Sequence, residues 1–187
     1  MSEVRLQVKN LCKSFGITKA VQNVSFNVNK GEVHALIGEN GSGKSTLTNM
    51  LTGIYSIDSG TFVLDGKEIH PKNQVEANEE GVSIIVQELG TLSGLTVAEN
   101  IFLGHEDRFV HFGIKNTNAM NKEATELLHK YGFDRIKAPD IIDNYNFEDR
   151  KLVEIVKATY FEPKIVVIDE TTTALSQEGR EELYKHM

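Results

Sequence analysis

A glycine-rich segment constrains the fold of this chain more than any other stretch of it. The segment matches the pattern G-x-x-x-x-G-K-[ST] and reads Gly38-Glu39-Asn40-Gly41-Ser42-Gly43-Lys44-Ser45-Thr46. An apolar run precedes it at residues 33–37, and apolar residues follow it at the spacing of a helix. We therefore predict a strand with His34 in the core, then the loop, then a helix, which is the setting that a phosphate-binding loop requires.

The residue types in this segment suit a nucleotide and its metal ion. Gly41 and Gly43 permit positive φ, so successive N–H groups of residues 40–45 can converge on phosphate oxygens. The helix adds unpaired N–H groups and the positive end of its dipole. In this pattern Lys44 reaches the β- and γ-phosphates, and the Ser45 hydroxyl holds Mg2+. An ordinary glycine-rich turn is the alternative, and the flanking elements argue against it.

Charge and cysteine content narrow the possible functions. The chain has 187 residues, enough for one domain with an inserted subdomain. Its net charge of −7 argues against general nucleic-acid binding, which needs a basic face. Cys12 is the only cysteine, which excludes an intrachain disulfide and a cysteine-based metal site. Because the sequence has no apolar signal region and no apolar run near ~20 residues, we expect a cytoplasmic protein.

Strands dominate the first part of the chain. Apolar and polar residues alternate at 4–8 and at 24–28, which predicts an antiparallel β-layer. Phe15 lies between these strands, where its ring could stack on a nucleobase or pack under the hairpin. A further strand with an Asp-Gly turn is expected over 61–69.

The next stretch predicts a short helix over 71–80, closed by Gly81, and then a buried strand over 82–86. Gln87 follows this strand. A polar residue just past the carboxyl end of a sheet strand lies where α/β folds bind ligands. We therefore include Gln87 among the candidate site residues.

Three helices are expected between residues 95 and 161. Thr96, Asn121 and Asn146 each stand where an N-cap residue is expected, and the last of these helices covers 147–160. Residues 105–118 show no clear period. This part of the chain therefore predicts an α-helical subdomain.

These expectations give an α/β fold of the P-loop nucleoside triphosphatase class. Its core has a mainly parallel sheet with an antiparallel β-subdomain beside it, and is formed by residues 1–94 and 162–187. The α-helical subdomain, residues 95–161, is inserted into that core.

Two carboxylates follow the last apolar run. Residues 165–168 are apolar throughout, which predicts a parallel strand covered on both faces, and Asp169-Glu170 stand at its carboxyl end. A solvated end of the strand is the alternative. Downstream of a phosphate-binding loop, Asp169 is expected to hold Mg2+ directly or through water, and Glu170 to orient or deprotonate the attacking water.

With its motifs in this order, the sequence resembles the ATP-binding subunit of an ABC transporter. Three segments resemble the monosaccharide importers of the ribose, galactose and xylose type, namely Gln87-Glu88-Leu89, Leu95-Thr96-Val97-Ala98-Glu99-Asn100-Ile101-Phe102-Leu103-Gly104 and Val153-Glu154-Ile155-Val156-Lys157-Ala158. The resemblance implies an ATPase with ATP and Mg2+ as cofactors. In such a protein Phe15 stacks on adenine and Gln87 contacts Mg2+ and the attacking water. The catalytic residues implied are Lys44, Gln87 and Glu170, and the metal ligands are Ser45, Gln87 and Asp169.

The resemblance also implies partners. Members of this family pair two nucleotide-binding domains head to tail, as separate subunits or as a fused tandem, and Thr173-Ala174-Leu175-Ser176 resembles the D-loop that crosses between them. They act on transmembrane permease subunits at the inner face of the cell membrane. A periplasmic or surface sugar-binding protein delivers the sugar, and no nucleic acid takes part.

Departures from the family pattern bear on activity. The family has Leu-Ser-Gly-Gly-Gln where this chain has Tyr145-Asn146-Phe147-Glu148-Asp149, so Glu148 replaces the second glycine. An anion about 4 Å from a phosphate costs roughly 4 kcal/mol at intermediate dielectric, and we therefore predict that the site completed by this loop is weak or inactive. Thr171 stands where the family usually has proline, and no histidine matches the family's switch histidine. We expect an incomplete nucleotide domain, one part of a longer subunit.

Other functions fit less of the sequence. A regulatory module that binds nucleotide without hydrolysing it would explain the altered loop. A non-transport ABC ATPase that acts on DNA or ribosomes is disfavoured by the acidic charge. A GTPase is disfavoured because Asn121-Lys122-Glu123-Ala124 lacks the aspartate of a guanine-reading N-K-x-D.

Overall fold

The computed structural model describes residues 3–85 and 90–168. Contacts within the chain divide it into two compact units. The first consists of the residues up to Ser83 together with Pro163–Val167, and the second takes in Ile84–Glu162. The division expected from the sequence, at 94/95 and 161/162, remains a proposal.

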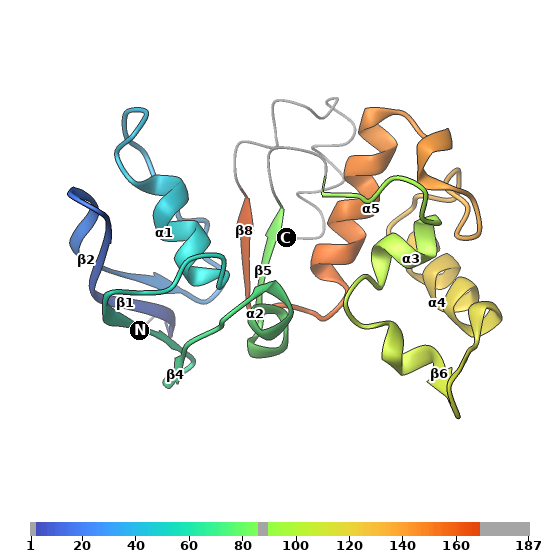
Figure 1. The fold of residues 1–187 in the computed structure, drawn as a ribbon, viewed down its shortest axis with the longest axis horizontal. Helices are drawn as coiled ribbons and strands as arrows, with labels where there is room; N and C mark the ends of the chain where they lie inside the picture. The colour runs from blue at the N-terminus through green and yellow to red at the C-terminus, as the bar shows by residue number, and fades with distance from the viewer. Residues whose placement is uncertain (1–2, 86–89, 169–187) are drawn as a thin grey trace. The chain divides into compact units, whose positions relative to one another are not determined.

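An antiparallel sheet forms the body of the first unit (Figure 1). Its strands are β1 (Val4–Phe15), β2 (Thr18–Asn29), β3 (Ser59–Leu64) and β4 (Lys67–Ile69), in the order β2-β1-β3-β4. Neighbouring strands pair antiparallel throughout, and the predicted β-layer is thereby confirmed, with strands longer than the alternating segments suggested. One face carries the core, which includes Leu6, Val8, Leu11, Phe62 and Leu64.

Two helices accompany this sheet. α1 (Lys44–Leu51) follows the glycine-rich loop and buries Leu47, Met50 and Leu51, as its apolar spacing predicts. α2 (Gln74–Glu80) begins at Asn73, whose side chain accepts the N–H of Glu76. It ends at Gly81, where φ is +96°, so the predicted glycine stop is confirmed.

The strand predicted before the glycine-rich loop is wrong. Residues 33–37 form no strand, and Val33 is 85% and Ile37 94% exposed. An apolar run becomes a strand only beside a neighbour that takes its N–H and C=O groups. None of the sheets formed by the described residues includes residues 33–37. His34 is therefore exposed rather than in the core; its ring stacks on Phe26 with 5.1 Å between centroids.

Among the described residues, a sheet of two strands is the part of the expected parallel core sheet that is present. β5 (Val82–Ile85) pairs with β8 (Ile165–Ile168), and the two strands run in the same direction in Figure 1. The Ile165 N–H donates to the Gly81 carbonyl at 3.1 Å, which aligns their starting ends. β5 is largely buried as predicted, whereas β8 is half-buried instead of covered on both faces. Within the described residues β8 has a neighbour on one side only.

The second unit is mainly helical. Its elements are α3 (Val97–Ile101), the 3-10 turn η1 (Glu106–Phe109), the hairpin β6 (Val110–His111) and β7 (Ile114–Lys115), α4 (Thr117–Lys130), the 3-10 turn η2 (Ile142–Asn144) and α5 (Phe147–Thr159). The buried faces of the three helices meet in a core that includes Val97, Phe102, Ala124, Leu128 and Leu152. The helical character predicted for this part is confirmed.

The helix starts show where local signals succeeded. Thr96 caps α3 in a capping box with Glu99, and Asn146 caps α5, both as predicted. The start predicted at Asn121 is wrong, because α4 begins five residues earlier with Asn116 as its cap. The Asn116 side chain accepts the Ala119 N–H at 3.0 Å, which satisfies that helix end before position 121 is reached.

Among the residues that the structure describes, no helix combines the length and apolar character needed to cross a bilayer.

Candidate functional site

The glycine-rich loop has the backbone that its sequence predicts. φ is +83° at Gly41 and +91° at Gly43. A Cβ on Gly43 would lie 2.3 Å from the Ala20 carbonyl oxygen, and one on Gly38 would lie 2.6 Å from the Ser42 hydroxyl. Both positions therefore exclude any larger residue without local rearrangement. Gly41, by contrast, has nothing within 4 Å of its missing Cβ, so its backbone is open to an approaching group.

Lys44 folds back across the loop. Its Nζ donates to the carbonyl oxygens of Gly38 at 2.8 Å and Glu39 at 2.9 Å. The Ser42 N–H also donates to the Glu39 carbonyl, at 3.1 Å, which closes the turn. An ammonium group has three donors, so one N–H of Lys44 beyond these two bonds can serve an anionic oxygen. The loop thus holds a positive charge at its own edge.

The start of α1 leaves its N–H groups for an external acceptor. The first intrahelical bond runs from the Leu47 N–H to the Gly43 carbonyl at 3.0 Å, so the N–H groups before Leu47 have no acceptor within the helix. Gly43 offers no side-chain cap, and the first turn contains no acidic residue. Ser45 is exposed there, and Thr46 is half-buried. This end can bind an anion through its N–H groups and its dipole.

Phe15 lies at the end of β1 with a half-exposed ring, 44% accessible. The edge of Tyr55 meets it at 5.1 Å between centroids, and Lys13 Nζ lies 5.5 Å from its centre. Lys13 is fixed in turn by Asp58, whose Oδ1 is 2.9 Å from Nζ. Neighbours therefore hold the ring while part of it stays exposed, and its role in stacking on a nucleobase remains a prediction.

Asp58 is a supporting residue that sequence reasoning missed. Its carboxylate accepts from Lys13 and, through Oδ2, from the Ser14 N–H at 2.7 Å. The lysine bond, followed by this backbone bond, lowers the pKa of Asp58. Strand alternation puts Lys13 and Phe15 on one face and could have indicated the pair. Asp58, 45 residues from Lys13, carried no local signal.

Several predicted site residues lie outside the described residues. They are Gln87, Asp169, Glu170 and Thr171, together with 173–176. Their roles as Mg2+ ligands and catalytic groups remain predictions. Within residues 3–85 and 90–168 no group of three or more His, Cys, Asp or Glu side chains could hold a metal ion. Ser45 is the predicted Mg2+ ligand that the structure describes.

The altered segment 145–149 forms a well-bonded start to α5. The Asn146 side chain accepts the Asp149 N–H at 2.8 Å, and both Glu148 and Asp149 lie in the first turn. Arg135 Nε donates to Asp149 Oδ1 at 2.7 Å. Two carboxylates therefore stand at this positive helix end, which they stabilise from within the chain.

Tyr145 at the start of this segment is held by its hydroxyl. The oxygen accepts the Lys137 N–H at 2.8 Å and donates to Asp140 Oδ2 at 2.9 Å. Burial raises the pKa of Tyr145. The tyrosine thus ties the segment to the chain between α4 and α5, which a leucine at this position could not do.

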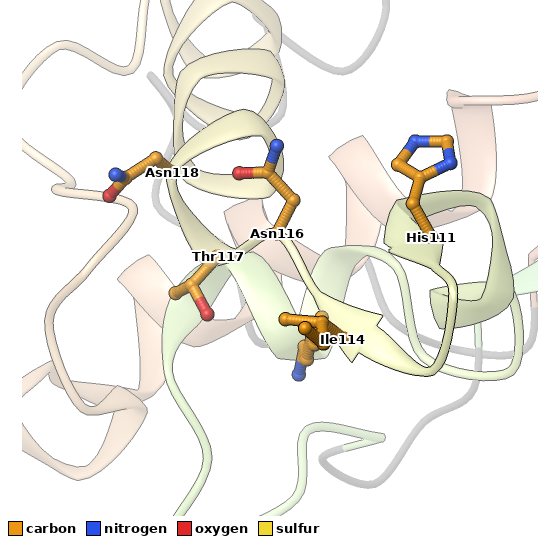
Figure 2. A pocket seen from close by; sticks show the side chains of 6 residues that line it. His111, Ile114, Asn116, Thr117 and Asn118 are labelled. Carbon is orange, nitrogen blue, oxygen red and sulfur yellow. The ribbon is translucent and has the colours of Figure 1, made fainter.

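A shallow hollow lies at the hairpin before α4, and Figure 2 shows its lining. Its walls are His111, Ile114, Lys115, Asn116, Thr117 and Asn118. Asn116 is engaged as the cap of α4, and Lys115 Nζ lies 2.8 Å from Glu99 Oε1. Because these two polar groups already have partners and the hollow is open to solvent, it is not the candidate site.

Comparison with known proteins adds a family assignment. Residues 21–173 match the family described as "ABC transporter". The chain is 40% identical over 181 residues to the ribose import ATP-binding protein RbsA of Bacillus cereus, covering 97% of this chain and 36% of that protein. It is 37% identical over 182 residues to the galactofuranose transporter ATP-binding protein YtfR of Escherichia coli, with the same two coverages. The chain thus spans about a third of the length of these relatives.

Solved structures show the same fold. The ADP conformation of MJ1267, an ATP-binding cassette of an ABC transporter, superposes with a TM-score of 0.78 at 29% identity over 99% of this chain and 76% of that one. A nucleotide-free ATP-binding cassette gives 0.79 at 29% identity, covering 98% of this chain and 75% of that one.

Proposed function

Because this chain belongs to the ABC transporter family, we propose that it is an ATP-binding and ATP-hydrolysing domain that powers sugar import, as part of a longer subunit. One observation carries the proposal. An open α1 N-terminus, the positive φ of Gly41 and Gly43, and the Lys44 ammonium all meet in the glycine-rich loop. An α/β fold of the P-loop class, shared with ATP-binding cassettes, supports it.

The loop residues present fit a bound triphosphate with Mg2+. The first turn of α1 holds no carboxylate that would repel phosphate, and nothing crowds Gly41. Backbone N–H groups of residues 40–45 would donate to phosphate oxygens, with the Ser42 N–H giving up its bond to the Glu39 carbonyl. Lys44 would donate its third N–H to a β- or γ-phosphate oxygen. Ser45 would supply a hydroxyl ligand to Mg2+.

We infer the remaining roles from the family resemblance. Phe15 would stack on the adenine, Asp169 and Gln87 would complete the Mg2+ site, and Glu170 would orient the attacking water. Lys44 would neutralise charge that develops on the transferred phosphoryl group.

The partners follow from the same family. We infer a second nucleotide-binding domain, separate or fused, transmembrane permease subunits, and a sugar-binding protein that acts through them. The working position would be the cytoplasmic, inner face of the cell membrane. Relatives named for ribose import and for galactofuranose transport support a sugar as cargo.

A thermal-melt titration with Mg-ATP and Mg-GTP tests nucleotide binding. A ligand at 100 times its Kd adds about 2.7 kcal/mol of stability, and we expect a raised Tm with ATP. Lys44→Ala should abolish the shift, whereas Lys72→Ala, which removes an exposed lysine of the same unit, should retain it. A well-folded chain with no shift at millimolar ATP would contradict the proposal.

A second candidate is a regulatory module that binds ATP without hydrolysing it. It is supported by Glu148 and Asp149 in the first turn of α5, where the family presents glycine N–H groups to a phosphate. Restoring Leu-Ser-Gly-Gly-Gln at 145–149 in the complete subunit should raise coupled turnover at least tenfold if the roughly 4 kcal/mol repulsion limits it. Unchanged turnover would show that repulsion between the acidic segment 145–149 and a phosphate does not limit ATP hydrolysis.

A further inference from the structure

The segment 90–94, which follows Gln87 in the sequence, is held at alternate residues by buried side chains. The Gly90 N–H donates to Glu154 Oε1 on α5, and the Leu92 N–H donates to Asn100 Oδ1 on α3 at 2.6 Å. Glu154 is 5% and Asn100 1% exposed. These hydrogen bonds are therefore shielded from water. A hydrogen bond is stronger in the low-dielectric interior of a protein than in water.

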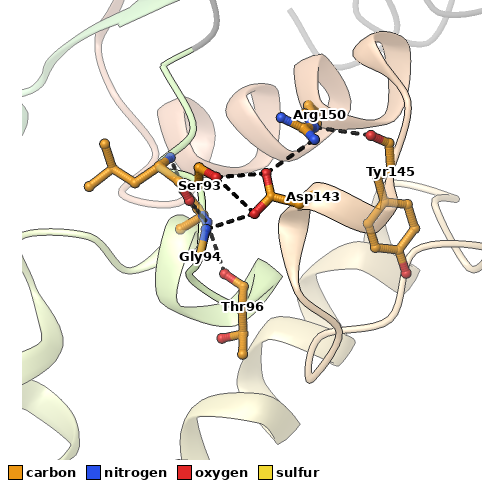
Figure 3. Close-up of polar contacts among 8 residues, drawn as sticks. Ser93, Gly94, Thr96, Asp143, Tyr145 and Arg150 are labelled. Carbon is orange, nitrogen blue, oxygen red and sulfur yellow. Dashed lines mark hydrogen bonds and ion pairs between the residues drawn. The ribbon is translucent and has the colours of Figure 1, made fainter.

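Asp143 on η2 continues this series and extends it toward α5, as Figure 3 shows. Its Oδ2 accepts the Gly94 N–H at 2.7 Å, and both carboxylate oxygens lie 2.9 Å from the Ser93 hydroxyl. Its Oδ1 lies 3.3 Å from Arg150 Nη2. Arg150 then donates through Nε to the Tyr145 carbonyl at 3.0 Å. A continuous polar link thus runs from residues 93–94 to the first residue of the segment 145–149.

The backbone beneath this link is also paired. The Ile142 N–H donates to the Leu95 carbonyl and the Val97 N–H to the Asp140 carbonyl, both at 2.9 Å. These bonds place the turn that carries Asp143 directly against the chain after residue 94. The carboxylate is therefore presented by a fixed backbone, and the pKa of Asp143 is lowered mainly by the Gly94 N–H and then by Ser93.

We propose that Asp143 is a positioning residue that holds the segments 90–94 and 145–149 at one spacing, so that displacement of one is passed to the other. This inference rests on the proposed function, because there both segments adjoin residues that serve a nucleotide site. Asp143 is not among the residues expected to bind the nucleotide or Mg2+. Its carboxylate is suited to the task because it is acceptor-only and can serve Gly94 and Arg150 at once.

The choice of substitution follows from that chemistry. In Asp143→Asn one oxygen becomes an NH2 group, which would face either the Gly94 N–H or the Arg150 guanidinium as donor against donor. One of the two connections must then be lost while shape is kept. Arg150→Lys keeps the charge but gives up the planar fork that reaches Asp143 and Tyr145 together.

Amide hydrogen exchange of the chain tests the link. In Asp143→Asn we expect exchange to quicken about tenfold or more both within 93–95 and within 145–149, because a bond to a charged group is lost from a shared network. Arg150→Lys should quicken exchange at 145–149 more than at 93–95. The sheet β1–β4 of the other unit should exchange as before in both variants.

The matched control is Asp134→Asn, the same substitution at an exposed carboxylate that pairs with His129. It should leave both segments unchanged. If Asp143→Asn alters 93–95 alone, or alters both segments only as much as Asp134→Asn does, the proposal is overturned. Circular dichroism and the urea midpoint identify a variant that fails to fold, in which case Arg150→Lys decides.

Two further readouts separate this inference from the proposed function. The Tm shift with Mg-ATP should persist in Asp143→Asn, since the glycine-rich loop is untouched; a wild-type chain without that shift would contradict the function and not the link. In the complete subunit assembled with its permease, Asp143→Asn should lower kcat of coupled ATP hydrolysis several-fold with KM for ATP unchanged. A raised KM with unchanged kcat would contradict a positioning role.

Discussion

The N-termini of α1 and α5 carry the same backbone groups but differ in what satisfies them. α1 begins at an αL glycine with no side-chain cap and no acid in its first turn. α5 begins at Asn146, which caps it, and carries Glu148 and Asp149 in its first turn. Both helix ends have N–H groups without an intrahelical acceptor and a positive dipole. The difference teaches that side chains decide whether a helix end is left for an anionic ligand or is satisfied within the chain.

The largest expected effect comes from substituting Gly43, the glycine at the start of α1. Gly43→Ala should cost about 3 kcal/mol or more in the free energy of unfolding, because φ is +91° and the new Cβ would lie 2.3 Å from the Ala20 carbonyl. Gly41→Ala is the matched control, since φ is +83° there but nothing lies within 4 Å. It should cost about 1 kcal/mol. Urea denaturation of both variants measures the difference, and equal losses would contradict the close approach at Gly43.

The second prediction concerns a substitution that gives the first turn of α1 an acidic residue, as α5 has. Thr46 holds the third helical position of α1, which corresponds to Asp149 in α5. Thr46→Asp should abolish the stabilisation by Mg-ATP, about 2.7 kcal/mol at 100 times the wild-type Kd, while leaving the ligand-free chain at least as stable as before. Thr46→Asn is the neutral control and should keep part of the shift. The Tm with and without ATP is the measurement, and a shift equal in Asp and Asn variants would contradict the charge argument.

A third prediction concerns pH at another helix start that carries an acid. Glu99, in the capping box of α3, has its pKa lowered from 4.5 to about 2, chiefly by Lys115 and then by the Thr96 N–H. Because the folded-state pKa lies below the unfolded one, its contribution is present above pH 4.5 and is lost as pH falls toward 2. At about 1.4 kcal/mol per pKa unit, about 3 kcal/mol should be lost by pH 2, of which about 2 kcal/mol is lost between pH 6 and pH 3.

The urea midpoint measured from about pH 6 to pH 3 checks this for the wild type and for Glu99→Gln. The variant should be less stable at the higher pH and should approach the wild type in acid. Glu126→Gln removes an exposed partner of Lys122 and should hardly alter the profile. Parallel profiles for wild type and Glu99→Gln would show that the capping box does not titrate.

The smallest expected effect comes from removing the side-chain cap of α5, a kind of cap that α1 lacks. Asn146→Ala should cost about 1 kcal/mol, because the Asp149 N–H loses its acceptor. Asn144→Ala, an exposed residue of η2, is the control and should change stability by less than about 0.5 kcal/mol. Urea midpoints measure both, and an equally small change at Asn146 would mean that water replaces the cap without loss.

Local signals predicted well wherever neighbours in sequence suffice. Thr96 and Asn146 cap helices, Gly81 stops one, and the Asp65-Gly66 turn joins β3 to β4, all as expected. The prediction that Asn121 caps a helix is wrong because Asn116, which has the same side-chain acceptor, caps that helix earlier in the chain. Such competition between similar caps is decided by the packing of the helix that follows, which the local pattern does not contain.

The sequence by itself determined the glycine-rich loop, because its pattern fixes positive φ at Gly41 and Gly43 and puts Lys44 and Ser45 at the start of a helix. Only the tertiary structure decided that the apolar residues 33–37 stay outside the antiparallel sheet, and that Asp58 supports Lys13 beside Phe15. It also decided that Asp143 joins residues 93–94 to Arg150. The physical reason is range: φ and capping depend on atoms a few residues apart, whereas strand pairing and polar links need partners that folding brings together.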